Sequence, residues 1–154
     1  MNKRLWIALA LAVVAAVAGL RPGTHPANSE SPTARHQQST AHADITSLTA
    51  ERRVASYLQQ HQRLPDYYLT KSQARRQGWQ PQQGNLCDRL PGKAIGGDHF
   101  ANREGRLPQR QGRQWYEADV NYQCGHRSAD RLLYSSDGLI FVTKDHYRSF
   151  NQVD

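Results

Sequence analysis

The residues best suited to chemistry in this sequence are a glutamate inside a predicted strand and two arginines that follow it. Residues 115–120 alternate in character, so strand geometry places Glu117 on the face opposite the apolar set. Periodicity alone slightly favours a solvated position there. Arg131 falls in the next predicted strand and Arg127 follows the turn at Gly125. Pairing of the two strands across that turn would bring one carboxylate and two guanidiniums together. One carboxylate cannot occupy all the guanidinium donors, so some would remain free to bind a phosphate.

A lysine and a histidine elsewhere extend this set. Lys71 falls in the first turn of a predicted helix, where the helix dipole disfavours a cation, unless that terminus binds an anion. His146 lies in a predicted turn; such a histidine is usually a surface residue, yet its pKa near neutrality suits proton transfer. The sequence contains neither metal-ligand spacing nor a glycine-rich phosphate loop. Together these residues supply a possible acid, a possible base and several cations, with no metal or cofactor. This combination indicates phosphoryl transfer.

Short helices are predicted in the first half of the chain. Thr49 is expected to cap a helix with Glu51 in its first turn, and the stripe that this helix would bury is Val54, Tyr57, Leu58 and His61. Thr70 and Gln73 form a capping box for a second helix, which Gly78 would end. A third short helix is predicted between Asn85 and Leu90.

Strands follow. They are predicted at 115–120, 131–134, 139–142 and, as a short fourth, 147–153, with Asp137-Gly138 as a hairpin turn. Residues 93–113, which are rich in glycine, are predicted to be a loop. This order indicates an α+β fold, in which N-terminal short helices pack on a C-terminal twisted antiparallel β-sheet.

The N-terminal segments differ in character from the remainder of the 154 residues. Residues 1–20 combine a basic start, an apolar run and a small-residue cleavage site, as in a secretory signal peptide; an uncleaved membrane anchor is the alternative. Residues 21–43 are polar and predicted to be a disordered spacer or pro-segment. Residues 44–154 would form the folded domain, with 16 Lys/Arg and 12 Asp/Glu, a net +4 that favours polyanionic partners without proving one.

The chain has two cysteines, Cys87 and Cys124. An even number in an exported chain favours a disulfide, which here would close a loop of about 37 residues. A thiolate nucleophile is the alternative, but no cysteine-hydrolase signature surrounds either residue.

Seven segments together resemble the barnase/binase family of secreted bacterial guanine-preferring ribonucleases. They occur in order and almost without gaps across residues 50 to 153: Leu64–Ser72, Gly84–Leu86, Pro91–Asp98, Phe100–Pro108, Glu117–Tyr122, Arg131–Asp137 and Asp145–Tyr147. The resemblance implies the barnase-like fold and a metal-independent endoribonuclease that cleaves single-stranded RNA 3′ to guanosine through a 2′,3′-cyclic phosphate.

The resemblance also implies a role for each catalytic residue. Glu117 would be the general base and His146 the general acid. Lys71, Arg127 and Arg131 would stabilise the charge that develops on the phosphoryl oxygens.

Base recognition would fall to the loop from Phe100 to Glu104. The Glu104 carboxylate would accept the two donors on the Watson–Crick edge of guanine, while backbone N–H groups of Asn102 and Arg103 face its O6. The other residues expected to bind substrate are Phe100, Ala101, His126 and Tyr147.

The sequence departs from its relatives at several positions. His126 stands where relatives have a phenylalanine, and Ala101 where they have a serine. Gly138 replaces a tryptophan and Gln62 a nearby histidine. The two cysteines are unlike the best-known members; in the family fold they would lie in the short third helix and the turn after the first predicted strand, close enough to bridge.

The remaining expectations concern partners and location. The chain is expected to be a monomer that is secreted or periplasmic, with no stable membrane association after signal cleavage. A barstar-like acidic inhibitor protein is a further expected partner. The rival functions are an RNA-binding module without catalysis and a surface-anchored interaction protein, neither of which explains why Glu117 and His146 are both present.

Overall fold

The structure, a computed structural model, describes residues 44–154, which all belong to one compact unit. The predicted signal peptide 1–20 and spacer 21–43 lie outside the described residues and stay predictions. Within residues 44–154, no helix is both long and apolar enough to cross a membrane.

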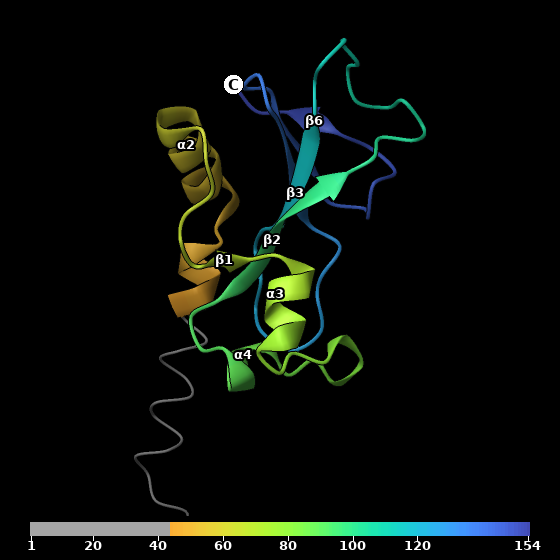
Figure 1. The fold of residues 1–154 in the computed structure, drawn as a ribbon. Coiled ribbons are helices and arrows are strands. Elements are labelled where there is room, and N and C mark those ends of the chain that lie inside the picture. The colour runs from red at the N-terminus through yellow and green to blue at the C-terminus, as the bar shows by residue number, and fades with distance from the viewer. Residues whose placement is uncertain (1–43) are drawn as a thin grey trace, which may run out of the picture. The chain divides into compact units, whose positions relative to one another are not determined.

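A six-stranded sheet with the order β1-β2-β3-β4-β5-β6 forms the centre of the fold (Figure 1). Its strands are β1 Tyr68–Leu69, β2 Ala94–Phe100, β3 Trp115–Asp119, β4 Arg131–Ser135, β5 Ile140–Thr143 and β6 Asn151–Gln152. The predicted α+β class is confirmed. The sheet is not wholly antiparallel, however, because β1 pairs with β2 in parallel. The predicted Asp137-Gly138 turn joins β4 to β5, with Gly138 at φ +97°.

Strand β2 corrects the prediction that residues 93–113 form a loop. Its glycines are required by neighbouring strands, not by a turn. A Cβ on Gly96 would lie 2.6 Å from the Tyr68 ring and 2.8 Å from the Ala118 Cβ, so only glycine fits between β1 and β3. Gly97 adopts φ +96°, where the β2–β3 register shifts between Gly96 and Asp98.

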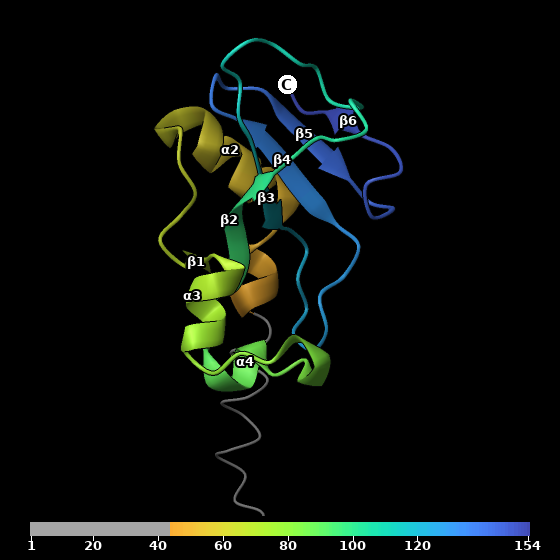
Figure 2. The same ribbon diagram turned by 45° about the vertical axis from the view of Figure 1, so that its right-hand side comes forward.

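The helices precede the antiparallel part of the sheet: α2 Glu51–His61, α3 Lys71–Arg76, a 3-10 turn Pro81–Gln83 and α4 Leu86–Arg89. Figure 2 shows α2 lying behind β4, with α3 and α4 together at the other end of the sheet. Helix α2 buries Val54, Ala55 and Leu58, whereas the predicted His61 is exposed. The capping box of Thr70 and Gln73 is confirmed and starts α3 directly after β1, which places Lys71 beside β2 and β3.

Thr49 does not cap α2 as predicted. The N-cap residue is Ala50, and the exposed N–H of Glu51 instead donates to the side chain of Asn121 at 3.2 Å. Thr49 ends a helical segment at residues 44–48: its hydroxyl donates to the Ile45 carbonyl at 2.8 Å and accepts from the Tyr122 N–H at 3.0 Å. These contacts attach the start of α2 to the chain that follows β3.

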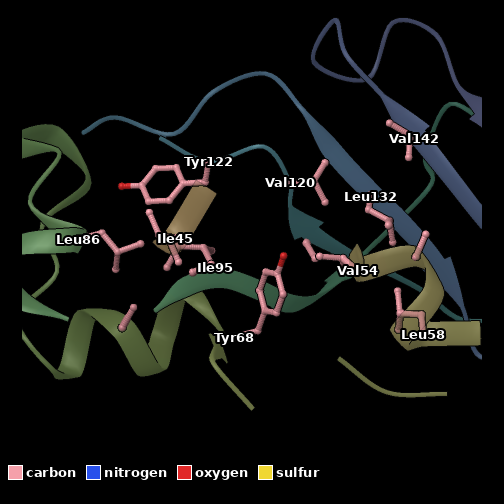
Figure 3. Close-up of a cluster of buried hydrophobic side chains, with 14 of the residues drawn as sticks. Ile45, Val54, Leu58, Tyr68, Leu86, Ile95, Val120, Tyr122, Leu132 and Val142 are labelled. Atoms are coloured by element: carbon pink, nitrogen blue, oxygen red, sulfur yellow. The ribbon is translucent and has the colours of Figure 1, made fainter. Parts of the chain in front are cut away.

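The two faces of the sheet are both covered. The main core joins α2 to β4 and β5 at one end and the α4 region to β2 at the other (Figure 3); its labelled members are Ile45, Val54, Leu58, Tyr68, Leu86, Ile95, Val120, Tyr122, Leu132 and Val142. A second cluster on the opposite face contains Leu107, Trp115 and Leu133. The predicted alternation along β3 is therefore correct, but its second face is buried, not solvated.

The predicted disulfide is confirmed. It joins Cys87 of α4 to Cys124 in the turn after β3, with 5.6 Å between the two Cα atoms. The bond thus ties the last short helix to the chain segment that leads to Arg127 and Arg131.

Replacing both cysteines with alanine is expected to lower the free energy of unfolding by about 4 kcal/mol, because the bond closes a 37-residue loop in the unfolded chain. Urea denaturation of the double variant beside the oxidised protein measures the difference. Reduced and alkylated protein is the matched control and should behave like the variant. A difference below about 1 kcal/mol would show that the cross-link hardly restricts the unfolded chain.

Candidate active site

A cavity of about 550 Å³ opens beside β3, between the loop after β2 and the loop after β5. It brings together every predicted catalytic residue and nearly every predicted base-binding residue: Lys71, Glu117, Arg127, Arg131, His146, Phe100, Ala101, Asn102, Arg103, Glu104 and Tyr147. His126 lies outside it. The cavity is cationic, since five arginine or lysine side chains line it against the two carboxylates of Glu104 and Glu117.

Glu117 lies at the centre of β3 and is only 5% exposed, which corrects the expectation of a solvated position. Its Oε1 accepts a hydrogen bond from Lys71 Nζ at 2.7 Å, and its Oε2 accepts one from the Tyr147 hydroxyl at 2.5 Å. Arg127 Nη2 lies 3.9 Å from Oε1. Burial alone would raise the pKa of Glu117, but the hydrogen bonds from Lys71 and Tyr147 and the charges of Lys71 and Arg127 outweigh it and hold the pKa below its ordinary value. Glu117 is therefore ionised at neutral pH.

Both arginines face a second carboxylate, Asp119, which the sequence analysis missed. Arg127 makes two hydrogen bonds to it, at 2.8 and 2.6 Å, and Arg131 Nε lies 3.1 Å from Oδ1. Asp119 is 1% exposed and Arg131 is 3% exposed. Asp119 and Arg131 are directly paired across β3 and β4, so the sequence spacing could have revealed them. The predicted meeting of Glu117 with the two arginines is present, with Asp119 holding the guanidiniums in place.

His146 lies on the loop after β5, exposed and at φ +55°. Its ring centroid is 4.8 Å from that of Tyr147, and within residues 44–154 its side chain makes no hydrogen bond. Asp145 fixes the loop by accepting hydrogen bonds from the Thr143 hydroxyl, the Arg148 N–H and both donors of Ser149. No local sequence pattern predicts this role of Asp145.

The loop after β2 is braced from within by Asn102. Its side chain donates to the Leu107 carbonyl at 2.9 Å and accepts from the Leu107 N–H at 3.1 Å. Among the described residues, the backbone N–H groups of Arg103 and Glu104 have no hydrogen-bond partner. These donors are therefore free for a ligand in the cavity.

Glu104 and Arg106 link this loop to the one that carries His146. The Glu104 side chain is 73% exposed, and its Oε2 lies 2.7 Å from Arg106 Nε. The same guanidinium donates to the Arg148 carbonyl. Phe100 stacks on Tyr147, with 5.3 Å between ring centroids and an interplanar angle of 16°. The carboxylate predicted to read the base and the loop of the predicted acid thus share one bridging side chain.

His126 is exposed, and its Nε2 lies 3.2 Å from the Gln82 carbonyl. Its backbone approaches Gly84 so closely that a Cβ there would lie 2.9 Å from the His126 N. The position therefore packs against the 3-10 turn, and its contact with substrate stays a prediction. Within residues 44–154, no cluster of three or more His, Cys, Asp or Glu side chains could hold a metal ion.

Comparison with known proteins decides the family. The sequence model of a family described as ribonuclease matches residues 51–154. This chain belongs to that ribonuclease family. The ribonucleases of Bacillus intermedius and Bacillus pumilus are each 59% identical to it over 100 residues, which cover 65% of this chain and 62% of theirs. The ribonuclease of Heyndrickxia coagulans is 59% identical over 100 residues that cover 92% of its length. The match thus spans about three fifths of each Bacillus ribonuclease, and the resemblance to the barnase/binase family is confirmed.

In this family member, Lys71→Met is expected to raise the pKa of Glu117, because the substitution removes a hydrogen bond and a positive charge while burial remains. The pH titration of the Glu117 side-chain carboxyl by carbon NMR measures the change. Lys93→Met, which removes a lysine that makes no ion pair among the described residues, is the control and should leave the titration where it was. An unchanged titration in Lys71→Met would mean that Lys71 does not keep Glu117 ionised.

Asp119→Asn is expected to lower the free energy of unfolding by about 3–5 kcal/mol, since it leaves two largely buried guanidiniums without their carboxylate. Chemical denaturation measures this loss. Asp66→Asn breaks the exposed pair with Arg63 and serves as the control, with almost no expected effect. Equal, small effects in both variants would argue against a structural role for Asp119.

Proposed function

We propose that this chain is an exported, metal-independent endoribonuclease that cleaves single-stranded RNA 3′ to guanosine. The observation that carries the proposal is the buried, ionised Glu117 held among cations in a cavity whose rim bears an unconstrained histidine, His146. A base of low exposure, a titratable acid and guanidinium donors are the groups that phosphoryl transfer requires. Membership of a ribonuclease family gives the reaction class.

In the first step, Glu117 removes the proton from the ribose 2′-hydroxyl, and the 2′-oxygen attacks the adjacent phosphorus. Protonated His146 gives its proton to the departing 5′-oxygen, so the P–O5′ bond breaks and a 2′,3′-cyclic phosphate remains. In the second step, neutral His146 removes a proton from water and the hydroxide attacks phosphorus. The P–O2′ bond breaks as Glu117 returns its proton to the 2′-oxygen, which leaves a 3′-phosphate. DNA lacks the nucleophile and would not react.

The cations act on the phosphoryl group. Lys71 and Arg127 lie within 4 Å of Glu117, so they are close to any phosphate that the base can reach. Arg131 is held in a fixed position by its ion pair with Asp119, and its positive charge would also act on the phosphoryl group. Because these groups are already oriented and partly buried, they can stabilise the developing charge without reorganising.

Guanine selection would use the loop after β2. The Glu104 carboxylate would accept the N1–H and N2–H donors, and free backbone N–H groups would face O6. Since Glu104 is paired with Arg106, the base would share or replace that ion pair. Phe100 and Tyr147 supply aromatic surface beside the loop.

The location and partners follow from the same proposal. Residues 1–20 would act as a signal peptide, residues 21–43 as a spacer, and residues 44–154 as a monomeric ribonuclease domain in the periplasm or outside the cell. An acidic inhibitor protein that covered the cationic cavity would protect the producing cell.

The decisive experiment is digestion, with EDTA present, of a fluorescent DNA oligonucleotide that contains one guanosine ribonucleotide. The protein is expected to cut 3′ to that guanosine. Glu117→Ala and His146→Ala should each reduce kcat by about 10²- to 10⁴-fold. Asp66→Ala and His61→Ala remove an exposed carboxylate and an exposed imidazole that do not line the cavity, and both variants should cut at the normal rate.

Two results would contradict the proposal. A folded protein that binds the oligonucleotide without cutting it would favour an RNA-binding module. Cutting that requires a divalent metal would replace the acid–base mechanism.

A further inference from the structure

A second cavity, of about 570 Å³, lies on the other side of the base-binding loop. Residues 99–102 line both this cavity and the catalytic one, so the start of the loop forms a common wall. Neither Lys71, Glu117, Arg127, Arg131 nor His146 lines the second cavity. The second cavity is therefore next to the base-recognition end of the catalytic cavity, and the residues proposed to cleave the phosphate do not line it.

Two arginines line this second cavity, and they differ in how firmly the fold holds them. Arg113 makes three hydrogen bonds to Asp137, at 2.8, 3.0 and 2.8 Å, and another to the Pro108 carbonyl, so its guanidinium is used in holding the loop. Arg110 lines the same cavity, but its side chain is 74% exposed and only approaches Asp137 at 4.0 Å. Its guanidinium donors therefore remain available for an anion.

Aromatic and polar groups complete the lining. The His99 ring is held in one orientation by Gln114, at 2.8 Å from Nε2, and by an edge contact with Tyr116 at 6.0 Å between centroids. Trp115 is 3% exposed, and its indole N–H has no hydrogen-bond partner among the described residues. Gln111 adds an exposed amide. A fixed ring, an unpartnered buried donor and a free guanidinium suit a planar base with its phosphate.

We propose that the second cavity binds the nucleotide on the 5′ side of the guanosine. Arg110 contacts the phosphate and His99 stacks on the base. The 5′ side is indicated because the leaving nucleotide, on the 3′ side, must lie next to His146, which is not part of this cavity. The inference rests on the proposed ribonuclease function and defines its substrate as a strand that extends across the loop.

The test compares three RNA substrates: the dinucleotide GpU, the same dinucleotide with two uridines added 5′, and one with two uridines added 3′. The quantity measured is the ratio of kcat/KM for each extended substrate to that for GpU. Wild-type protein should gain from the 5′ extension. Arg110→Gln is expected to reduce that gain about tenfold, mainly through KM, because base stacking and one phosphate contact are the interactions at stake. His99→Ala should also reduce it.

Arg52→Gln is the matched control, since Arg52 is an exposed arginine of α2 without an ion pair among residues 44–154. It should keep the full gain. The inference is overturned if wild-type protein gains nothing from 5′ extension, if Arg110→Gln affects only the 3′-extended substrate, or if Arg52→Gln loses as much as Arg110→Gln.

A binding measurement separates failure of this inference from failure of the proposed function. The affinity for the 5′-extended strand with 2′-deoxyguanosine in place of guanosine, which cannot be cleaved, is measured at several salt concentrations. Arg110→Gln should lower the slope of log affinity against log salt by about 0.7, the value for one phosphate contact on a single strand. An unchanged slope overturns the subsite. A folded protein that cleaves none of the three substrates contradicts the ribonuclease proposal instead.

Discussion

The carboxylate of Asp119 is the constraint on which the candidate active site depends. Two guanidiniums are brought to one sheet face by β4 and by the turn before it, and one carboxylate on the neighbouring strand balances them. Removing arginines from water is costly unless a partner compensates, so Asp119 must be buried with them. Glu117, two residues away on the same face, can then keep its own oxygens for Lys71 and Tyr147. Asp119 therefore has a structural role, and Glu117 remains available for the proposed proton transfer.

Much of the fold could be read from local sequence signals. The capping box at Thr70, the turn at Asp137-Gly138 and the alternation along β3 depend on neighbouring residues, and each is present in the structure. Strand β2 escaped prediction because Gly96 and Gly97 resemble loop residues. Gly96 is required by the approach of Tyr68 and Ala118 from distant parts of the chain, and Gly97 by its positive φ at the shift in the β2–β3 register; no local pattern contains either cause. Thr49 failed as a cap for the same reason, since Asn121 supplies the cap from 70 positions away.

The site was harder to derive from single residues than from the resemblance. Periodicity placed Glu117 on the correct face but indicated a solvated position, because it cannot register the cover that Phe100, Tyr147 and Phe150 give to that face. Asp145 and Arg106 act through loop contacts whose partners depend on tertiary structure. His126 shows the converse: a position aligned with a family contact lies outside the cavity, against the turn at Gln82.

The disulfide makes the stability of this domain a property of its surroundings. Thiols stay reduced in the cytosol and pair in oxidising compartments, so the bond between α4 and the turn after β3 would form only in an oxidising compartment. If the chain is exported as proposed, the same sequence is easier to unfold before it crosses the membrane, when it must pass through a narrow channel, and harder to unfold afterwards, when proteases surround it. The gain in stability would then require only the change in redox potential between the two compartments.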